Sequence, residues 1–200
     1  SKIHEAALQM NLGTAHESQG KMAQAETNYR SALIAHERHD RQLYAGHTLG
    51  CLGRLMWTQG QMDHAAAHLD RALVVLDAVG ARLHEAMFRA IRSGVSADMN
   101  NLVEAEHDLS AARQIFKETN DSAGLSVCEV LEGHIDLARG RCGKSKAERN
   151  SHANTAQARI QRVVEPTAKS HGQDSLAIHS IEMRLAIRML ERRIALERDG

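Results

Sequence analysis

Residues 11–33 read NLGTAHESQGKMAQAETNYRSAL, and residues 51–73 read CLGRLMWTQGQMDHAAAHLDRAL. The two stretches carry Leu-Gly, Gln-Gly, Met, Ala and Ala-Leu at the same offsets, one 40-residue period apart. A period of about 20–50 residues is the sequence signature of solenoids and related arrays. Proline occurs once, and residues that favour helices are abundant. The repeated unit is therefore expected to be all-helical.

Gly, Asn and Asp recur where the chain is expected to turn between two helices. A helix commonly ends on a residue with a left-handed backbone, which Gly adopts most easily and Asn next. The turns inside the repeats fall at Gly20, Gly60, Asn100 and Gly140. The turns that end the second helix of each repeat fall at Asp40, Gly80 and Asn120. This spacing predicts antiparallel helix pairs in repeats at 1–40, 41–80, 81–120 and 121–140 onward.

A second set of small residues lies inside the expected helices. It comprises Gly13, Gly53, Ser93 and Gly133. Glycine costs about 1 kcal/mol in a helix interior relative to alanine. We therefore expect neighbouring helices to approach closely at these positions. Alanine columns at 25, 65 and 105, and at 32, 72 and 112, indicate the same tight packing on the second helices.

The period fails after Gly140, so residues 141–200 are expected to form a degenerate last repeat and a C-terminal helix. Pro166 is expected to end the preceding helix, and residues 167–175 to form a loop. The predicted helices lie near 3–18, 22–38, 41–59, 62–79, 82–99, 102–118, 122–139, 144–164 and 174–198. The expected fold class is thus all-α: an α-solenoid of about four repeats with a long capping helix.

The composition and charge of the chain argue against several classes of function. The chain has 25 basic and 25 acidic residues and a formal net charge of zero, whereas nucleic-acid-binding domains usually carry a basic excess. The sequence shows no apolar run long enough to span a membrane and no signal peptide at its start. Three cysteines without CxxC spacing favour free thiols in a reducing cytoplasm. We expect a cytoplasmic protein without direct nucleic-acid or membrane contact.

The repeats resemble the tetratricopeptide repeat (TPR) pattern W-x2-L-G-x2-Y, A-x3-F, A. The first unit matches with Gln9, Leu12, Gly13, His16, Ala25, Tyr29 and Ala32. The second unit matches with Leu49, Leu52, Gly53, Met56, Ala65, Leu69 and Ala72. The signature Trp and the closing proline are missing, and the period is 40 rather than 34 residues. The longer period resembles the extended TPR variant of bacterial regulators and scaffold proteins.

This resemblance implies a right-handed superhelix in which the first helix of each pair lines a concave groove. It implies a non-catalytic module that binds a protein or peptide segment, as the regulatory or sensor part of a larger bacterial signalling or transcription-regulator protein. The implied groove residues are Met10, Thr14, Glu17, His47, Arg54, Trp57, Met87, Asp98 and His134. Met10 and Thr14 occupy the positions of the Lys/Asn clamp of chaperone-binding TPR domains, so a C-terminal carboxylate ligand is not expected.

Two groove residues leave alternatives open. Trp57 is the sole tryptophan, and an aromatic side chain near an arginine is a typical binding hot spot. The alternative is that Trp57 packs against an adjacent helix. Arg54 either pairs with a carboxylate of the bound peptide or is a solvated arginine.

The last helix carries two apolar stripes. One stripe is sufficient to cap an array, and the second is expected to bury against a partner, which predicts a possible homodimer. The association residues are Ile181, Leu185, Ile187 and Leu190. The alternative is a capping helix that is deeply buried on the preceding pair.

Catalytic and metal motifs are not found. His64 and His68 lie four residues apart on one helix face, but no third ligand accompanies them. No phosphate-binding loop or nucleophile motif appears. We therefore expect no enzyme activity, no metal and no cofactor.

Overall fold

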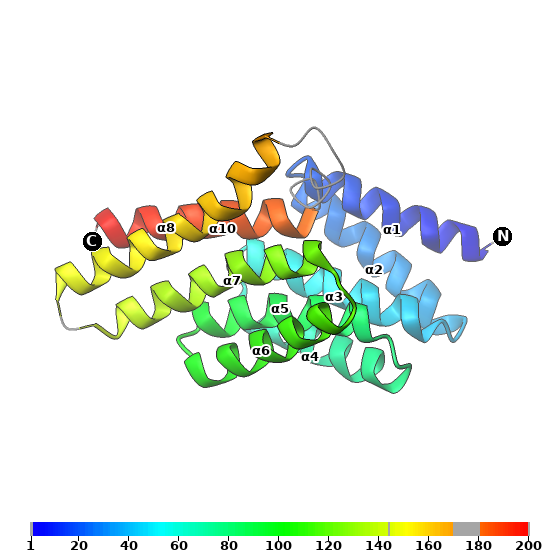
Figure 1. The fold of residues 1–200 in the computed structure, drawn as a ribbon. Coiled ribbons are helices and arrows are strands. Elements are labelled where there is room, and N and C mark those ends of the chain that lie inside the picture. The colour runs from blue at the N-terminus through cyan, green and yellow to red at the C-terminus, as the bar shows by residue number, and fades with distance from the viewer. Residues whose placement is uncertain (1, 144, 170–180, 200) are drawn as a thin grey trace. The chain divides into compact units, whose positions relative to one another are not determined.

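The computed structural model describes residues 2–143, 145–169 and 181–199, which fold into α-helices (Figure 1). The helices are α1 (Lys2–Ser18), α2 (Met22–Arg38), α3 (Gln42–Thr58), α4 (Met62–Ala78), α5 (Arg82–Asp98), α6 (Leu102–Glu118), α7 (Ser122–Arg141), α8 (Lys146–Lys169) and α10 (Ile181–Asp199). No strand occurs within these described ranges. Each of the predicted repeats 1–40, 41–80 and 81–120 holds two helices, so the predicted all-α class of helix pairs is confirmed.

The turns between the first seven helices repeat one backbone geometry. Six residues, twenty positions apart, have positive φ: Gly20, Asp40, Gly60, Gly80, Asn100 and Asn120. At the first of these, the Lys21 amide donates to the His16 carbonyl at 2.9 Å and the Gly20 amide to the Glu17 carbonyl at 3.0 Å. This pair of bonds is the Schellman motif, which satisfies the last carbonyls of a helix. The predicted turn positions up to residue 120 are confirmed.

The fourth repeat departs from this geometry in two places. Helix α7 runs through Gly140 to Arg141, so the predicted turn at Gly140 is wrong. A Cβ atom on Gly140 would lie 2.9 Å from the Cβ of His152. Because glycine has no Cβ, α8 can pack close to α7 at this position. Helix α8 continues past Pro166 to Lys169, which makes the predicted end at residue 164 wrong. The proline removes one amide donor without ending the helix.

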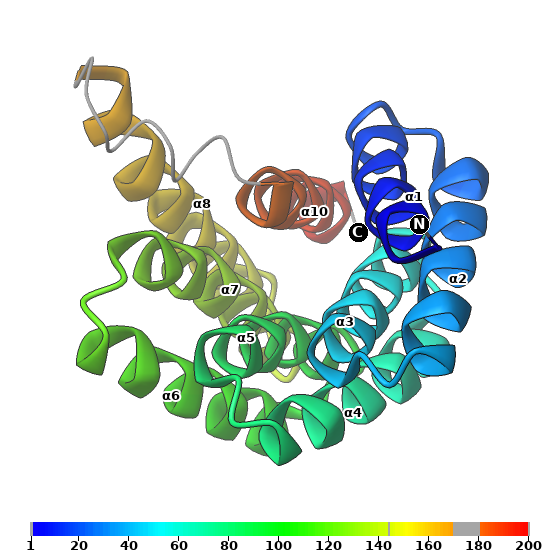
Figure 2. The ribbon, with the colours of Figure 1, turned by 90° about the vertical axis from the view of Figure 1, so that its right-hand side faces the viewer.

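The chain divides into two units, Ser1–Phe88 and Arg89–Gly200. In the first unit, α1 pairs with α2, α3 pairs with α4, and α2 also packs against α3. Figure 2 shows α1 and α3 on one side of this unit and α2 and α4 on the other. A Cβ on Gly13 would lie 2.6 Å from the Tyr29 ring, which confirms the predicted close approach. The alanine columns are fully buried (Ala25, Ala32, Ala65, Ala72, Ala105 and Ala112).

In the second unit, α6, α7 and α8 pack in sequence, and α10 packs against both α7 and α8. A side chain on Gly133 would collide with Leu190 of α10. Ion pairs join neighbouring helices: Asp136 of α7 accepts from Arg159 of α8 at 2.6 Å. Helix α8 begins with a capping box. The Ser145 hydroxyl accepts a hydrogen bond from the Glu148 amide, and the Glu148 carboxylate accepts one from the Ser145 amide.

Candidate binding hollow in the first unit

A hollow of about 360 Å³ opens between α1, the end of α2, α3 and the start of α5. This volume lies at the lower end of the range of about 300–1,000 Å³ typical of ligand pockets. The lining residues are Ala7, Met10, Asn11, His36, Leu43, Tyr44, His47 and His84. None of these lining side chains is an acid, a lysine or an arginine; the wall is apolar and aromatic, and its polar groups are Asn11 and three histidines.

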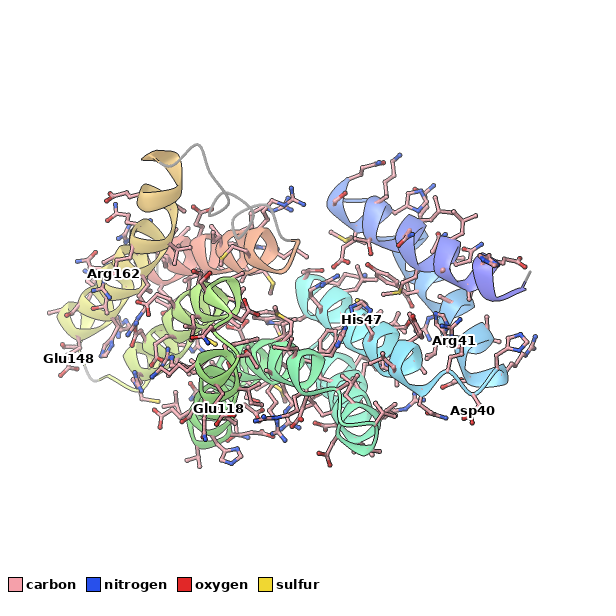
Figure 3. The ribbon with its side chains drawn as sticks, turned by 45° about the vertical axis from the view of Figure 1, so that its right-hand side comes forward. Asp40, Arg41, His47, Glu118, Glu148 and Arg162 are labelled. Carbon is pink, nitrogen blue, oxygen red and sulfur yellow. The ribbon has the colours of Figure 1, made fainter. Side chains whose placement is uncertain are left out.

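Tyr44 forms the exposed aromatic edge of the hollow. Its ring stacks on His36 with centroids 5.4 Å apart and an interplanar angle of 25°. The guanidinium carbon of Arg41, a residue labelled in Figure 3 at the N-terminal end of α3, lies 4.2 Å from the Tyr44 ring centroid. Such a cation–π contact holds the ring in one orientation. Tyr44 nevertheless remains 47% exposed, so its ring is available to a ligand.

His47, labelled on α3 in Figure 3, lines the hollow one turn further along the helix than Tyr44. Its ring meets His84 edge-on, with centroids 5.3 Å apart at 87°, and meets Phe88 with centroids 5.7 Å apart at 64°. The Phe88 ring can reach this position because a side chain at Gly50 would collide with it. A glycine one turn along α3 thus lets α5 come close enough to complete the wall.

Met10 contributes the α1 side of the hollow. The Thr48 hydroxyl lies 3.4 Å from the Met10 sulfur and donates to the Tyr44 carbonyl at 2.7 Å. Met10 is half-buried, so part of its side chain faces the hollow. A thioether is polarisable and flexible, and it adapts to apolar partners of different shape.

His36 is the buried polar group of the hollow. Its side chain is 2% exposed, and its Nδ1 atom has no hydrogen-bond partner. Burial lowers the pKa of His36, and the positive charge of Arg41 lowers it further. His36 is therefore neutral at pH 7, and the hollow presents an uncharged imidazole.

Two predicted groove residues, Glu17 and Arg54, instead form a buried ion pair between α1 and α3. Arg54 Nη2 donates to Glu17 Oε2 at 2.7 Å, and Arg54 Nε donates to Glu17 Oε1 at 3.1 Å. The Tyr29 hydroxyl also donates to Glu17 Oε2 at 2.7 Å. The Glu17 and Arg54 side chains are 0% and 2% exposed. Both predicted roles for Arg54, contact with a peptide and solvation, are wrong because Arg54 neutralises a carboxylate of its own chain.

Trp57 and Thr14 also lie outside the hollow. Trp57 is 2% exposed, so the alternative of packing against a helix is correct and its prediction as an exposed groove anchor is wrong. Thr14 is half-buried; its hydroxyl donates to the Met10 carbonyl at 3.2 Å and lies 3.2 Å from the Tyr29 hydroxyl oxygen. Met87 is half-buried and does not line the hollow.

In the second unit, the predicted groove residues Asp98 and His134 come together but are buried. His134 Nδ1 lies 3.5 Å from Asp98 Oδ1, and the two side chains are 0% and 1% exposed. Arg193 of α10 lies 3.4 Å from Asp98 Oδ2. The last helix therefore reaches these positions, and the prediction that they face an open groove is wrong.

The association residues of α10 are largely buried. Leu190 is fully buried, Leu185 is 5% exposed and Ile187 is half-buried. The side chain of Ile181 lies outside those that the structure describes. Because α10 packs on α7 and α8, the alternative of a deeply buried capping helix is correct, and the prediction that Leu185 and Leu190 face a partner is wrong.

The described residues contain neither a metal-binding cluster nor a membrane-spanning helix. Within the described residues, no group of three or more His, Cys, Asp or Glu side chains is arranged to hold a metal ion. In the same part of the chain, no helix combines the length and apolar character that crossing a bilayer requires.

Sequence reasoning identified Met10 and His47 in the hollow but missed His36, Tyr44 and His84. These three lie near helix ends, where the repeat pattern assigns turns rather than binding positions. A signal existed in the spacing: Tyr44 and His84 occupy the same position in two consecutive repeats. Aromatic rings at equivalent positions of adjacent first helices lie on the same side of an array.

Comparisons with known proteins returned no match, either to models of protein families or to curated proteins.

Proposed function

We propose that this chain is a non-catalytic interaction module, and that the hollow of the first unit binds an uncharged apolar or aromatic side chain of a peptide segment from a protein partner. The observation that carries the proposal is the convergence of three successive first helices on one hollow, with the predicted residues Met10 and His47 in its wall. The TPR resemblance adds the context of a regulatory or sensor part of a larger bacterial protein.

The chemistry of the lining favours this kind of ligand. Ligand pockets are usually apolar with a few polar groups that fix orientation. Tyr44 offers an exposed ring that is already oriented by Arg41 and His36, which reduces the entropy lost on binding. The neutral imidazole of His36 offers a hydrogen-bonding group without attracting a counter-ion. A strongly charged side chain would lose its hydration in the hollow without finding an opposite charge in the lining.

Selection from a phage-displayed library of random dodecapeptides tests the proposal. Wild-type protein serves as bait, and the Tyr44→Asp variant removes peptides that bind elsewhere. We expect enriched peptides that share an apolar or aromatic residue. Their Kd should rise by about 30-fold or more in Tyr44→Asp, the effect of losing a hot-spot residue.

The matched control is Val74→Asp, which places the same charge on the 72% exposed Val74 side chain of α4. This variant should bind selected peptides as tightly as wild type. Equal affinity for wild type and Tyr44→Asp, or a selection without any enriched sequence, contradicts the proposal.

A further inference from the structure

His36 is a polar residue at a position that the next two repeats fill with apolar side chains. It lies in the last turn of α2, and the equivalent residues of α4 and α6 are Leu76 and Phe116. All three side chains are buried, with exposed fractions of 2%, 0% and 1%. A fold that accepts leucine and phenylalanine at this position does not require an imidazole, so the presence of His36 needs another reason.

The position has the same packing role in the first and third repeats. Phe116 lies against Gly124, eight residues further along the chain, where a side chain would collide with its ring. His36 stacks on Tyr44, which is also eight residues further along. In both repeats, the last turn of a second helix packs against the first turn of the next helix. An apolar ring is sufficient for this role, and it does not use the two ring nitrogens of His36.

The His36 imidazole lacks a hydrogen bond in the structure. Its Nδ1 atom is buried and has no partner among the described residues. A buried polar atom without a hydrogen bond destabilises the folded state, and leucine or phenylalanine would avoid that cost. His36 also lines the hollow of the first unit. A ligand that enters the hollow is therefore placed to form a hydrogen bond with the imidazole.

The neutral state of His36 determines which ligand groups fit. Burial and the nearby Arg41 lower the pKa of His36, so its ring has one N–H donor and one nitrogen acceptor at pH 7. A phenolic hydroxyl both donates and accepts, and it can pair with either ring nitrogen. The apolar and aromatic wall, which includes Met10, Leu43 and Tyr44, suits the ring that carries such a hydroxyl.

We propose that the side chain bound in the hollow is a tyrosine of the partner segment, and that His36 selects it through a hydrogen bond with the phenolic hydroxyl. This inference rests on the proposed function and adds the identity of the bound side chain. A site with a buried polar group discriminates against an analogue that lacks the hydroxyl, because the analogue leaves that group unpaired. Phenylalanine would fill the hollow in the same way but would leave the imidazole without a hydrogen bond.

The test compares peptide selections on wild type and on His36→Leu, which carries the residue that the second repeat has at this position. The dodecapeptide library is selected on each protein. Wild type should enrich peptides that share a tyrosine, and His36→Leu should enrich phenylalanine or leucine at the shared position. The leading wild-type peptide is then synthesised with tyrosine and with phenylalanine at that position, and both affinities are measured by calorimetry.

Wild type should bind the tyrosine peptide about 10-fold more tightly than the phenylalanine peptide, which is the effect of one neutral hydrogen bond. His36→Leu should bind the phenylalanine peptide at least as tightly as the tyrosine peptide. The matched control is His64→Leu, which removes an exposed imidazole of α4 outside the hollow and should keep the 10-fold preference.

Urea unfolding distinguishes recognition from a structural role of His36. The midpoint of His36→Leu should equal or exceed that of wild type, because the substitution removes a buried polar atom without a partner. A lower midpoint overturns the inference, since the fold itself would then need the imidazole.

The binding results can also overturn the inference while the proposed function stands. They do so if the shared residue is not tyrosine, if wild type binds both peptides equally, or if the preference persists in His36→Leu, provided that Tyr44→Asp still weakens binding. Selected peptides whose affinity Tyr44→Asp leaves unchanged contradict the proposed function itself.

Discussion

Replacing Tyr29 by Phe tests the buried network that occupies the predicted groove positions of the first unit. The Tyr29 hydroxyl donates to Glu17 Oε2 at 2.7 Å, and both side chains are fully buried. Phe fills the same space, so the substitution removes the hydrogen bond without leaving a cavity. A hydrogen bond to a charged group contributes about 1.5–3 kcal/mol, and no solvent replaces it here. Burial, and next the nearby Cys51 and Glu17, raise the pKa of Tyr29, so the phenol stays a protonated donor.

Urea unfolding measures the effect. Trp57 is the sole tryptophan and is buried in the first unit, so its fluorescence reports the unfolding of that unit. With an m-value of about 2 kcal/mol per M, the midpoint of Tyr29→Phe should fall by about 0.7–1.5 M. The control Tyr44→Phe alters a 47% exposed ring and should change the free energy of unfolding by less than about 0.5 kcal/mol. Equal midpoints for the two variants would refute the buried network.

Two further predictions concern the packing and the pH response of the same unit. Gly13→Ala should destabilise the first unit, because the new Cβ would lie 2.6 Å from the Tyr29 ring. Overpacking of this kind costs about 1–3 kcal/mol. This cost offsets or exceeds the gain of about 1 kcal/mol that alanine brings in helix propensity. A rise in the urea midpoint of Gly13→Ala would count against the close approach of α1 and α2. Burial lowers the pKa of His36 in the folded protein. As the pH falls, the imidazole of the unfolded chain is therefore protonated before that of the folded protein. The folded state is then destabilised relative to the unfolded chain as the pH falls below about 6.5. His36→Gln should show a smaller loss of midpoint between pH 7.5 and pH 5.5 than wild type, and equal losses would contradict this assignment.

The repeating turns could be predicted from the sequence because each depends on one local property. A left-handed backbone at the helix end is best adopted by Gly, then Asn or Asp, and such residues stand at every twentieth position up to residue 120. Gly140 matches the same pattern, yet it lies inside α7. A glycine that admits a neighbouring helix and a glycine that ends one are indistinguishable by residue type. The choice at Gly140 depends on His152, a contact that the sequence does not specify.

The binding positions were harder to predict because exposure depends on tertiary contacts. Glu17 and Arg54 are 37 residues apart and belong to different repeats, and nothing local to either residue indicates their pairing. Trp57 is one of the predicted groove residues, but the burial of a position on a first helix depends on how closely other helices pack over it. The apolar stripes of α10 fit either a capping helix or an interface, and only its packing on α7 and α8 separates the two.

Binding of a peptide side chain in the hollow of the first unit can be followed at the methyl resonance of Met10. Protein labelled with [¹³C-methyl]methionine is titrated with a peptide selected on the wild type, and a Met10→Leu variant assigns the signal. We predict that the Met10 resonance shifts and saturates with the Kd measured by calorimetry, because Met10 lies in the wall of the hollow. The signal of Met99, a 45% exposed residue of the second unit, should stay in place. A saturating shift at Met99 with an unchanged Met10 resonance would contradict the account.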